Sequence, residues 1–311
     1  MAYPVSFKMK QEIVLELTFL GTADSTGYPH PFCACANCEE ARQLGGPSLR
    51  LRSSALINNE LLIDLGPDLL AASFRQGTSL AGVRYCLQTH PHIDHLDAAH
   101  LFMRSARFGV SNVPEFAFYG TNASLDRIRQ TFAENKATAS WNFLELLGAL
   151  ETTLIEVKPH QAFQVGQYDV VAVPASHDLP GKSLLYAISD GAGSIFYGND
   201  TGAIDDRVWE TLKAHQVRFD VVVLDHTYGL KSESPSHMNS PIVVQTIARM
   251  RAEGLLRPGA RCFANHIGHH SNPVHPKLVE IAAMHGYEVA YDGLTIEVGV
   301  PVQTGASAMI H

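Results

Sequence analysis

The sequence lacks any long run of hydrophobic residues. Its apolar stretches have the length of a strand, as in residues 221–224, whereas a membrane-spanning helix needs about 18 or more apolar residues. The segment from Met1 to Glu12 contains Lys8 and Lys10, but no apolar segment or small-residue cleavage site follows it. We therefore expect no membrane span and no signal peptide, and we predict a cytoplasmic protein.

The sequence also lacks an excess of positive charge. It contains 23 Lys and Arg against 31 Asp and Glu, which gives a formal net charge of -8. A nucleic-acid-binding surface is therefore not expected. An anionic substrate would have to be held by local positive charge, and a bound metal ion can supply that charge.

Cysteine is scarce, with 5 residues in the chain. An odd number does not suit a framework of disulfides. Cys33, Cys35 and Cys38 lie close together, and in a cytosolic protein such a cluster favours metal binding over disulfide formation. Cys86 and Cys262 lie in apolar, strand-like segments, so we interpret them as core residues.

Apolar periodicity and turn residues predict short strands interspersed with helices, without an internal repeat or a clear linker. The predicted strands cover Ile13–Leu20, Ser53–Asn58, Glu60–Leu65, Gly82–Gln88, Phe116–Gly120, Leu154–Val157, Gln161–Val165, Tyr168–Pro174, Leu184–Asp190, Ser194–Tyr197, Phe219–Leu224 and Ala260–Ala264, with a final hairpin at Val289–Val298. The predicted helices cover Cys38–Leu44, Asp68–Gln76, Leu96–Arg107, most of Asn122–Leu150, Asp205–His215, Ser240–Glu253 and Pro276–His285. This order predicts an α/β fold in which sheets pack together with helices outside, as one domain over residues 1–311.

The most distinctive stretch of the chain is the pattern H-x-H-x-D-H, formed by His90, His92, Asp94 and His95. It lies on a predicted strand-to-helix turn, where these side chains point into one cleft. Neutral imidazole and carboxylate groups at this spacing suit Zn²⁺ and related metals. The alternative is a solvated, His-rich turn, but four candidate ligands in this pattern rarely coincide by chance.

Three further residues follow predicted apolar strands, His177, Asp200 and His266, and Asp64 lies at the end of another. A lone histidine is usually a core or surface residue, but its place at a strand end beside the other candidates favours metal ligation. A carboxylate at the end of a buried strand needs a partner. Asp64 is therefore either a helix cap or turn residue, or a brace that orients the metal-binding loop.

The order of these candidate ligands along the chain resembles that of the metallo-β-lactamase superfamily: first H-x-H-x-D-H, then a lone His, a lone Asp and a late His. The resemblance extends from Leu17 to Glu297. The resemblance implies a four-layer αβ/βα sandwich with a dinuclear metal site at one edge, and it gives Asp64 the role of orienting the metal loop. The implied ligands are His90, His92 and His177 for the first metal, Asp94, His95 and His266 for the second, and Asp200 as the bridge. Two metals about 3.5–4 Å apart can generate a bridging hydroxide and also hold the oxygens of a phosphoryl centre.

The cysteine cluster, C-x-C-x2-C, resembles the phosphoribosyl cyclic phosphodiesterase branch, which works beside carbon–phosphorus lyase. That branch supplies a fourth ligand three residues after the last active-site histidine, which here is His269, with His270 as a neighbour that is easily mistaken for it. The resemblance thus implies a structural zinc bound by Cys33, Cys35, Cys38 and His269, and the alternative is a reduced thiol cluster without metal.

The segment DHTYG…SPSHMN also resembles this branch, in which a loop histidine meets the substrate. His237 matches it, as a general acid or leaving-group contact, unless it is an exposed loop residue. Two features depart from the branch: the residues Asp225 to Tyr228, and a longer segment from Asn122 to Pro159 that we expect to shape substrate access. Arg50, Arg52 and Lys182 are candidate phosphate contacts or, more ordinarily, surface charges.

These features predict a dinuclear, Zn- or Mn-dependent phosphodiesterase with one further structural Zn. A metal-bridging hydroxide would attack a small cyclic or nucleotide-like phosphodiester, with ribose 1,2-cyclic phosphate favoured, and Asp94, Asp200 and His237 would take the catalytic roles. One alternative is an oxidative cofactor-biosynthesis protein of the pyrroloquinoline quinone type, which also has an early cysteine cluster and a late His-Met pair. Others are a hydrolase of a lactone, thioester or RNA end, and a scaffold. The only partner expected is the small substrate, and the branch implies a homodimer.

Overall fold

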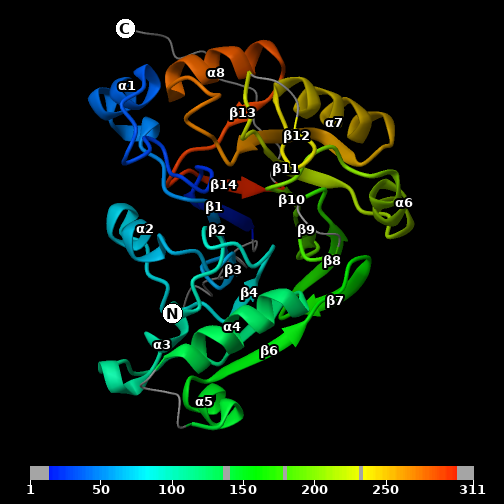
Figure 1. The fold of residues 1–311 in the computed structure, drawn as a ribbon. Helices are drawn as coiled ribbons and strands as arrows, with labels where there is room; N and C mark the ends of the chain where they lie inside the picture. Colours follow the sequence, from blue (N-terminus) through cyan, green and yellow to red (C-terminus); the bar gives the residue numbers. More distant parts are fainter. Residues whose placement is uncertain (1–13, 136–140, 178–180, 231–233, 300–311) are drawn as a thin grey trace, which may run out of the picture.

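Two β-sheets form the centre of the molecule. The structure, a computed structural model, describes residues 14–135, 141–177, 181–230 and 234–299, and within these ranges each sheet has seven strands (Figure 1). The first sheet has the order β14 (Thr295–Val298), β1 (Leu15–Gly21), β2 (Ser54–Ile57), β3 (Leu61–Ile63), β4 (Tyr85–Leu87), β5 (Phe116–Gly120) and β6 (Thr152–Glu156). The second has the order β13 (Glu288–Val289), β12 (Leu256–Asn265), β11 (Phe219–Asp225), β10 (Ser194–Gly198), β9 (Leu184–Ser189), β8 (Tyr168–Pro174) and β7 (Gln161–Val165).

Both sheets are mixed in the same way. Strands β14 to β3 pair antiparallel and β3 to β6 pair parallel. In the second sheet β7 to β10 pair antiparallel and β10 to β13 pair parallel. Each parallel connection requires a crossover segment outside the sheet, which is why helices lie on the outer faces.

Alternating side chains divide the core into layers. In β11, Val221 and Val223 lie in the cluster between the two sheets, whereas Val222 and Leu224 lie in the cluster under the outer helices of the second sheet. In β2, Ile57 faces the interior between the sheets and Leu56 faces the helices of the first sheet. Three buried clusters therefore separate four layers, and the predicted αβ/βα sandwich is confirmed.

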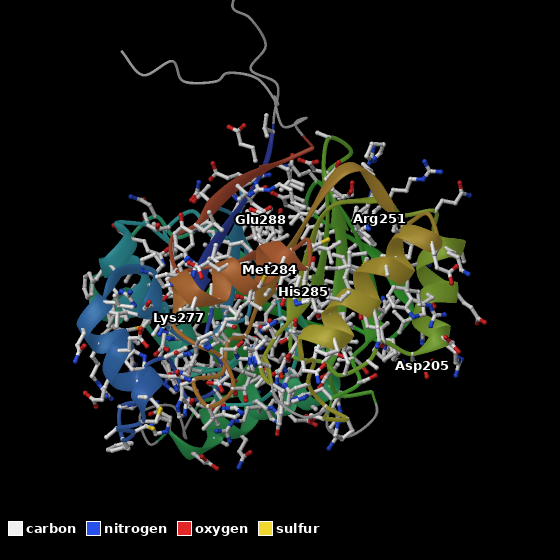
Figure 2. The ribbon with its side chains drawn as sticks, turned by 90° about the horizontal axis from the view of Figure 1, so that it is seen from above. Asp205, Arg251, Lys277, Met284, His285 and Glu288 are labelled. Atoms are coloured by element: carbon white, nitrogen blue, oxygen red, sulfur yellow. The ribbon has the colours of Figure 1, made fainter. Side chains whose placement is uncertain are left out.

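Helices cover both outer faces. The helices packed on the first sheet are α2 (Leu69–Gln76), α3 (Ala99–Phe102), α4 (Asn122–Glu134) and α5 (Phe143–Ala149). Those associated with the second sheet are α1 (Ala36–Leu44), α6 (Asp206–Ala214), α7 (Ser240–Ala252) and α8 (His275–Met284). Figure 2 shows α8 and α7 side by side over the second sheet, with Lys277 and Met284 labelled on α8 and Arg251 on α7. Within the described residues no helix has the length and apolarity that crossing a bilayer requires.

Most predicted elements are present, but the predicted final hairpin is wrong. β13 pairs with β12 in the second sheet, with Val289 beside Ala264, whereas β14 pairs with β1 in the first sheet, with Thr295 beside Thr18. The chain crosses from one sheet to the other between these strands. Apolar alternation is the same for either pairing, so it does not reveal the crossing.

The predicted helix Leu96–Arg107 is also wrong in its extent. Only α3, a single turn, is α-helical, followed by a 3₁₀ turn at Ala106–Phe108. Hydrogen bonds between residues three apart, as from Arg104 N to Leu101 O at 3.2 Å, replace a regular α-helical ladder. Ile13, at the start of the first predicted strand, residues 136–140 of the long helical segment and the N-terminal segment Met1–Glu12 lie outside the described residues.

Candidate metal centres

The candidate ligands predicted for the active site converge at one edge of the sandwich. His90, His177, Asp200 and His266 lie just beyond β4, β8, β10 and β12 respectively. Asp200 and His266 have positive φ angles of 55° and 57°, and Asp64, just beyond β3, has 67°. Non-glycine residues adopt such angles rarely, and functional sites are among the places where they cluster.

The first group consists of His90, His92, His177 and Asp200, whose ligand atoms all lie within 4.8 Å of one another. His92 Nδ1 lies 2.9 Å from His90 Nε2 and 3.2 Å from His177 Nε2. His90 Nε2 lies 3.1 Å from Asp200 Oδ2. Four donors thus face a common point between them.

The second group consists of Asp94, His95, His266 and the same Asp200. His95 Nε2 lies 3.1 Å from Asp94 Oδ2, 3.1 Å from Asp200 Oδ2 and 3.3 Å from His266 Nε2. Because Asp200 belongs to both groups, the seven residues form two adjoining sites with one shared carboxylate.

The chemistry of these donors fits two divalent metal ions. Asp94 and Asp200 are buried, and within the described residues neither forms an ion pair with Lys or Arg. Buried carboxylates are normally paired or bound to metal. The 2.9–3.3 Å separations of the facing ring nitrogens match the edge of a ligand tetrahedron around Zn²⁺, which is about 3.3 Å. Burial and the charge of His95 lower the pKa of His90 to about 4, so this ring is neutral and its lone pair is available.

Asp64 orients the metal-binding loop. It receives hydrogen bonds from the backbone N of Thr89 at 2.7 Å and from Gln88 Nε2 at 3.0 Å, and His95 Nδ1 lies 2.7 Å from its Oδ2. The Thr89 hydroxyl links it to His90 Nδ1, at 2.9 Å. The brace interpretation of Asp64 therefore fits these contacts, whereas α2 begins only after Asp68. Such partners on Nδ1 hold the tautomer that leaves Nε2 free for a metal.

Asp225 plays the matching part in the second sheet, and the sequence argument missed it. His266 Nδ1 lies 2.7 Å from the Thr227 hydroxyl, which in turn lies 3.1 Å from Asp225 Oδ2. Asp225 could have been identified in the same way as Asp64, because both are carboxylates at the end of a buried strand. In the sequence, Asp225 stood out only as a departure from the related branch.

His237 adjoins the carboxylates of Asp200 and Asp225. Its Nδ1 lies 2.9 Å from Asp225 Oδ2 and 3.1 Å from Asp200 Oδ1. Burial alone would lower the pKa of His237, but hydrogen bonds to Asp200 and Asp225 outweigh it and raise this pKa to about 11. The ring stacks on His266 with centroids 5.8 Å apart and on Tyr228 with centroids 5.9 Å apart. Its side chain is 19% exposed, so a substrate can reach it.

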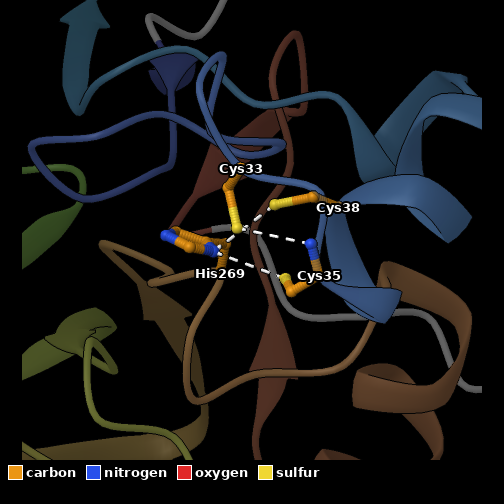
Figure 3. A group of neighbouring side chains, drawn as sticks. All are labelled: Cys33, Cys35, Cys38 and His269. Carbon is orange, nitrogen blue, oxygen red and sulfur yellow. Dashed lines mark hydrogen bonds between the residues drawn. The ribbon is translucent and has the colours of Figure 1, made fainter.

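The cysteine cluster meets His269 at a second, separate point (Figure 3). His269 Nδ1 lies 3.4 Å from Cys38 Sγ and 3.8 Å from Cys35 Sγ. Three thiols and one imidazole are a four-donor set of the kind that structural zinc binds with tetrahedral geometry. His270 points elsewhere, with its ring edge-on to Tyr228 at 5.5 Å. Cys86 and Cys262 are buried in the core, as predicted.

The three basic residues considered as phosphate contacts have different surroundings. Arg50 is buried and donates to the Thr22 hydroxyl and to the carbonyl of Ala290, so it is neither a phosphate contact nor a surface charge. Arg52 pairs with Asp68 at 2.6 Å. Lys182 lines a cleft of about 1000 Å³ that also contains His92 and Asp94. The start of the longer segment predicted to shape substrate access lines the same cleft.

Comparisons with known proteins agree with the fold. The model of a beta-lactamase superfamily domain matches residues 59–257. Coenzyme PQQ synthesis protein B of Cupriavidus necator is 25% identical, with 89% of this chain and 97% of that protein covered.

Two solved structures share the fold. One is a diphosphatase from the PhnP family, with a TM-score of 0.69, 22% identity and coverage of 91% of this chain and 96% of that one. The other is Zn²⁺-bound PqqB from Methylobacterium extorquens, with a TM-score of 0.67, 18% identity and coverage of 91% and 100%.

Proposed function

The chain belongs to the beta-lactamase superfamily, and from that premise we propose that it is a dinuclear metal-dependent phosphodiesterase. The observation that supports this most is the pair of adjoining four-donor groups that share Asp200. The proposed substrate is a small cyclic or nucleotide-like phosphodiester, with a ribose 1,2-cyclic phosphate favoured. The cysteine cluster with His269 is proposed to hold a structural zinc.

The proposed ligands are His90, His92 and His177 for one ion and Asp94, His95 and His266 for the other, with Asp200 between them. Two divalent ions held there supply a nucleophile from water at neutral pH and neutralise charge on the phosphoryl oxygens. The side chains behind them, Asp64 and Asp225, keep the ring nitrogens aimed at the same points.

His237 is proposed to act on the leaving group. Asp225 Oδ2 lies 2.9 Å from its Nδ1 and favours the protonated ring. In the imidazolium form Nε2 also carries a proton, which it can donate to the departing alkoxide oxygen. This leaves a neutral imidazole that remains hydrogen-bonded to Asp225.

Metal content measured together with turnover of bis(p-nitrophenyl) phosphate tests the proposal. We expect about three metal ions per chain, as zinc or as zinc plus manganese, and hydrolysis that chelation abolishes and metal restores. Full metal occupancy with no turnover of this ester or of ribose 1,2-cyclic phosphate would contradict a phosphodiesterase.

The second candidate is a cofactor-biosynthesis protein with oxidative chemistry. It is favoured by the relative named coenzyme PQQ synthesis protein B, which aligns with 89% of the chain. The same imidazole and carboxylate donors suit iron. Iron that co-purifies in the active site, together with oxygen uptake and no ester hydrolysis, would support this candidate over the first.

A further inference from the structure

A cavity of about 300 Å³ lies on the outer face of the first sheet. It is bounded by α2, by the single turn of α3 and by the segment that leads into β5. Of the described residues that line it, none is a candidate metal ligand, and none lines the cleft that contains His92 and Asp94. The cavity is therefore separate from the candidate active site.

The walls of this cavity are mainly aliphatic. They include side chains that belong to the outer core layer of the first sheet or pack against it, namely Leu62, Leu65, Leu69, Leu80, Val83 and Leu101. Leu70 and Met103 line the cavity where it meets the surface, and they are 51% and 48% exposed. An apolar cavity that opens to the surface and has the size of a small-molecule site suits an aliphatic chain.

Two polar side chains in the same cavity have buried atoms without a partner. His100 Nε2 and Arg104 Nε are buried, and neither forms a hydrogen bond within the described residues. Buried polar atoms are normally hydrogen-bonded, so each exception requires an explanation. In the same part of the chain, the guanidinium of Arg104 forms one hydrogen bond, from Nη2 to the carbonyl of Pro114. Its other donors are left for a ligand that enters the cavity.

The positive charge of Arg104 has no bound counter-ion among the described residues. Burial lowers the pKa of Arg104, and attraction to Glu151 offsets this only in part. Asp68, which interacts electrostatically with His100, is already bound to Arg52 at 2.6 Å. Because a buried charge is normally paired, the cation beside this apolar wall favours a ligand that carries negative charge.

We propose that this cavity binds a small carboxylate with an aliphatic chain, whose carboxylate group is held by Arg104 and His100 while the apolar walls enclose the chain. One guanidinium and one imidazole suit a single negative charge better than a phosphate dianion. The guanidinium donates to the carboxylate oxygens. In the imidazolium form of His100 both ring nitrogens are donors, so Nε2 donates to the same group. This inference does not rest on the proposed phosphodiesterase function.

Met103 lies where the carboxylate group would enter. Its Sδ is 3.2 Å from His100 Nδ1, and its side chain is 48% exposed. Because a methionine side chain is unbranched and flexible, it can move aside and give a ligand access to the buried nitrogen atoms. Arg104 is less free to move, since its guanidinium packs over the ring of Phe116 at 4.7 Å from the centroid.

Calorimetric titration of the metal-loaded full-length protein with octanoate, octan-1-ol and propanoate tests this. We expect octanoate to bind at one site per chain. Octan-1-ol lacks the charge and propanoate lacks most of the chain, so each should bind about tenfold or more weakly. Arg104→Met should lower the affinity for octanoate about tenfold and leave that for octan-1-ol unchanged. Arg107→Met, which replaces an exposed arginine outside the cavity lining, should keep both affinities.

A second pair of variants tests the site without altering its buried polar groups. Leu70→Glu places a negative charge where the cavity opens, so repulsion should weaken the binding of octanoate about fivefold or more. Phe74→Glu is the control, since Phe74 lies one turn further along α2, is 79% exposed and does not line the cavity. Thermal unfolding establishes that each variant is folded.

Three results would overturn the proposal. One is the absence of saturable octanoate binding, and another is equal affinity for octanoate and octan-1-ol. The third is octanoate binding that persists unchanged in the folded Arg104→Met and Leu70→Glu proteins, as expected if the carboxylate bound the active-site metals instead. None of these results depends on ester hydrolysis, so a failure of this site and a failure of the phosphodiesterase proposal are distinguishable.

Discussion

The two candidate metal centres are built in opposite ways. Cys33 and Cys35 come from the loop that leads into α1, and Cys38 comes from the start of that helix; Cys35 is exposed and Cys38 is buried. The seven histidine and aspartate ligands come from the ends of strands in both sheets, and all but His92 are buried. One loop after β12 serves both centres, since it carries His266 and His269.

This difference follows the chemistry that each donor set allows. Three thiolates and one imidazole would close the coordination of one zinc ion and leave no position for a substrate. The mixed nitrogen and oxygen donors form two adjoining groups with a shared carboxylate, and His237 and a cleft adjoin them. A metal ion at the thiol centre would therefore tie the start of α1 to the loop after β12, whereas the buried centre combines the donors and the access that a reaction site needs. Asn37 reinforces the first role by donating to the carbonyls of His269 and Asn272.

The largest expected effect comes from Asp200, because it alone belongs to both active-site groups. Asp200→Ala should lower turnover of bis(p-nitrophenyl) phosphate by about a thousandfold or more, since it disrupts both sites at once. Metal analysis should show the structural zinc retained and the active-site ions reduced. Asp169→Ala, an exposed carboxylate on β8, is the matched control. Undiminished turnover in a folded Asp200→Ala protein would remove the mechanism.

His237 should distinguish leaving groups. His237→Gln should lower hydrolysis of a ribose cyclic phosphate or another alkyl ester by about a hundredfold, because an alkoxide must be protonated as it departs. p-Nitrophenolate leaves without a proton, so the loss with bis(p-nitrophenyl) phosphate should be much smaller. The measurement is kcat for both substrates with the same metal-loaded preparation. Equal losses would show that His237 is not the proton donor.

Asp64 tests whether orientation behind the ligands matters at the buried centre. Asp64→Asn removes the carboxylate charge beside His95 Nδ1 and should cost about 10–100-fold in metal affinity or activity. Asp97→Asn is the control, since its carboxylate lies in the same loop but receives a hydrogen bond from the backbone of Ala99. Metal titration followed by calorimetry gives the affinity of each variant. If both variants behave alike, the brace is not specific to Asp64.

The smallest effect on turnover is expected at the thiol centre. Cys35→Ser should lower the zinc content by about one ion and the melting temperature by about 5 °C or more, with only a few-fold change in kcat. Cys262→Ala removes a buried thiol away from the cluster and should leave the metal content unchanged. A loss of activity as large as that of Asp200→Ala would mean that the two centres are not separate in function.

Much of this arrangement was predictable because its signals are local. The H-x-H-x-D-H pattern, the spacing of the cysteines and the strand before each lone ligand are all readable along the chain. Asp225 was missed because its role depends on Thr227 and His237 lying beside it in space. The short α3 was overestimated because apolar spacing does not report a run of 3₁₀ turns.

The order of residues along the chain specifies the types of candidate ligand, the apolar alternation that builds two sheets, and a net charge that is negative. The three-dimensional packing places β13 and β14 in different sheets, and it brings His95 to His266 across 171 positions of sequence. The physical reason is that side-chain chemistry and period are properties of short segments. Whether the candidate ligands come together depends instead on how the two sheets bury their apolar faces against each other, because this packing sets the distances between the strand ends.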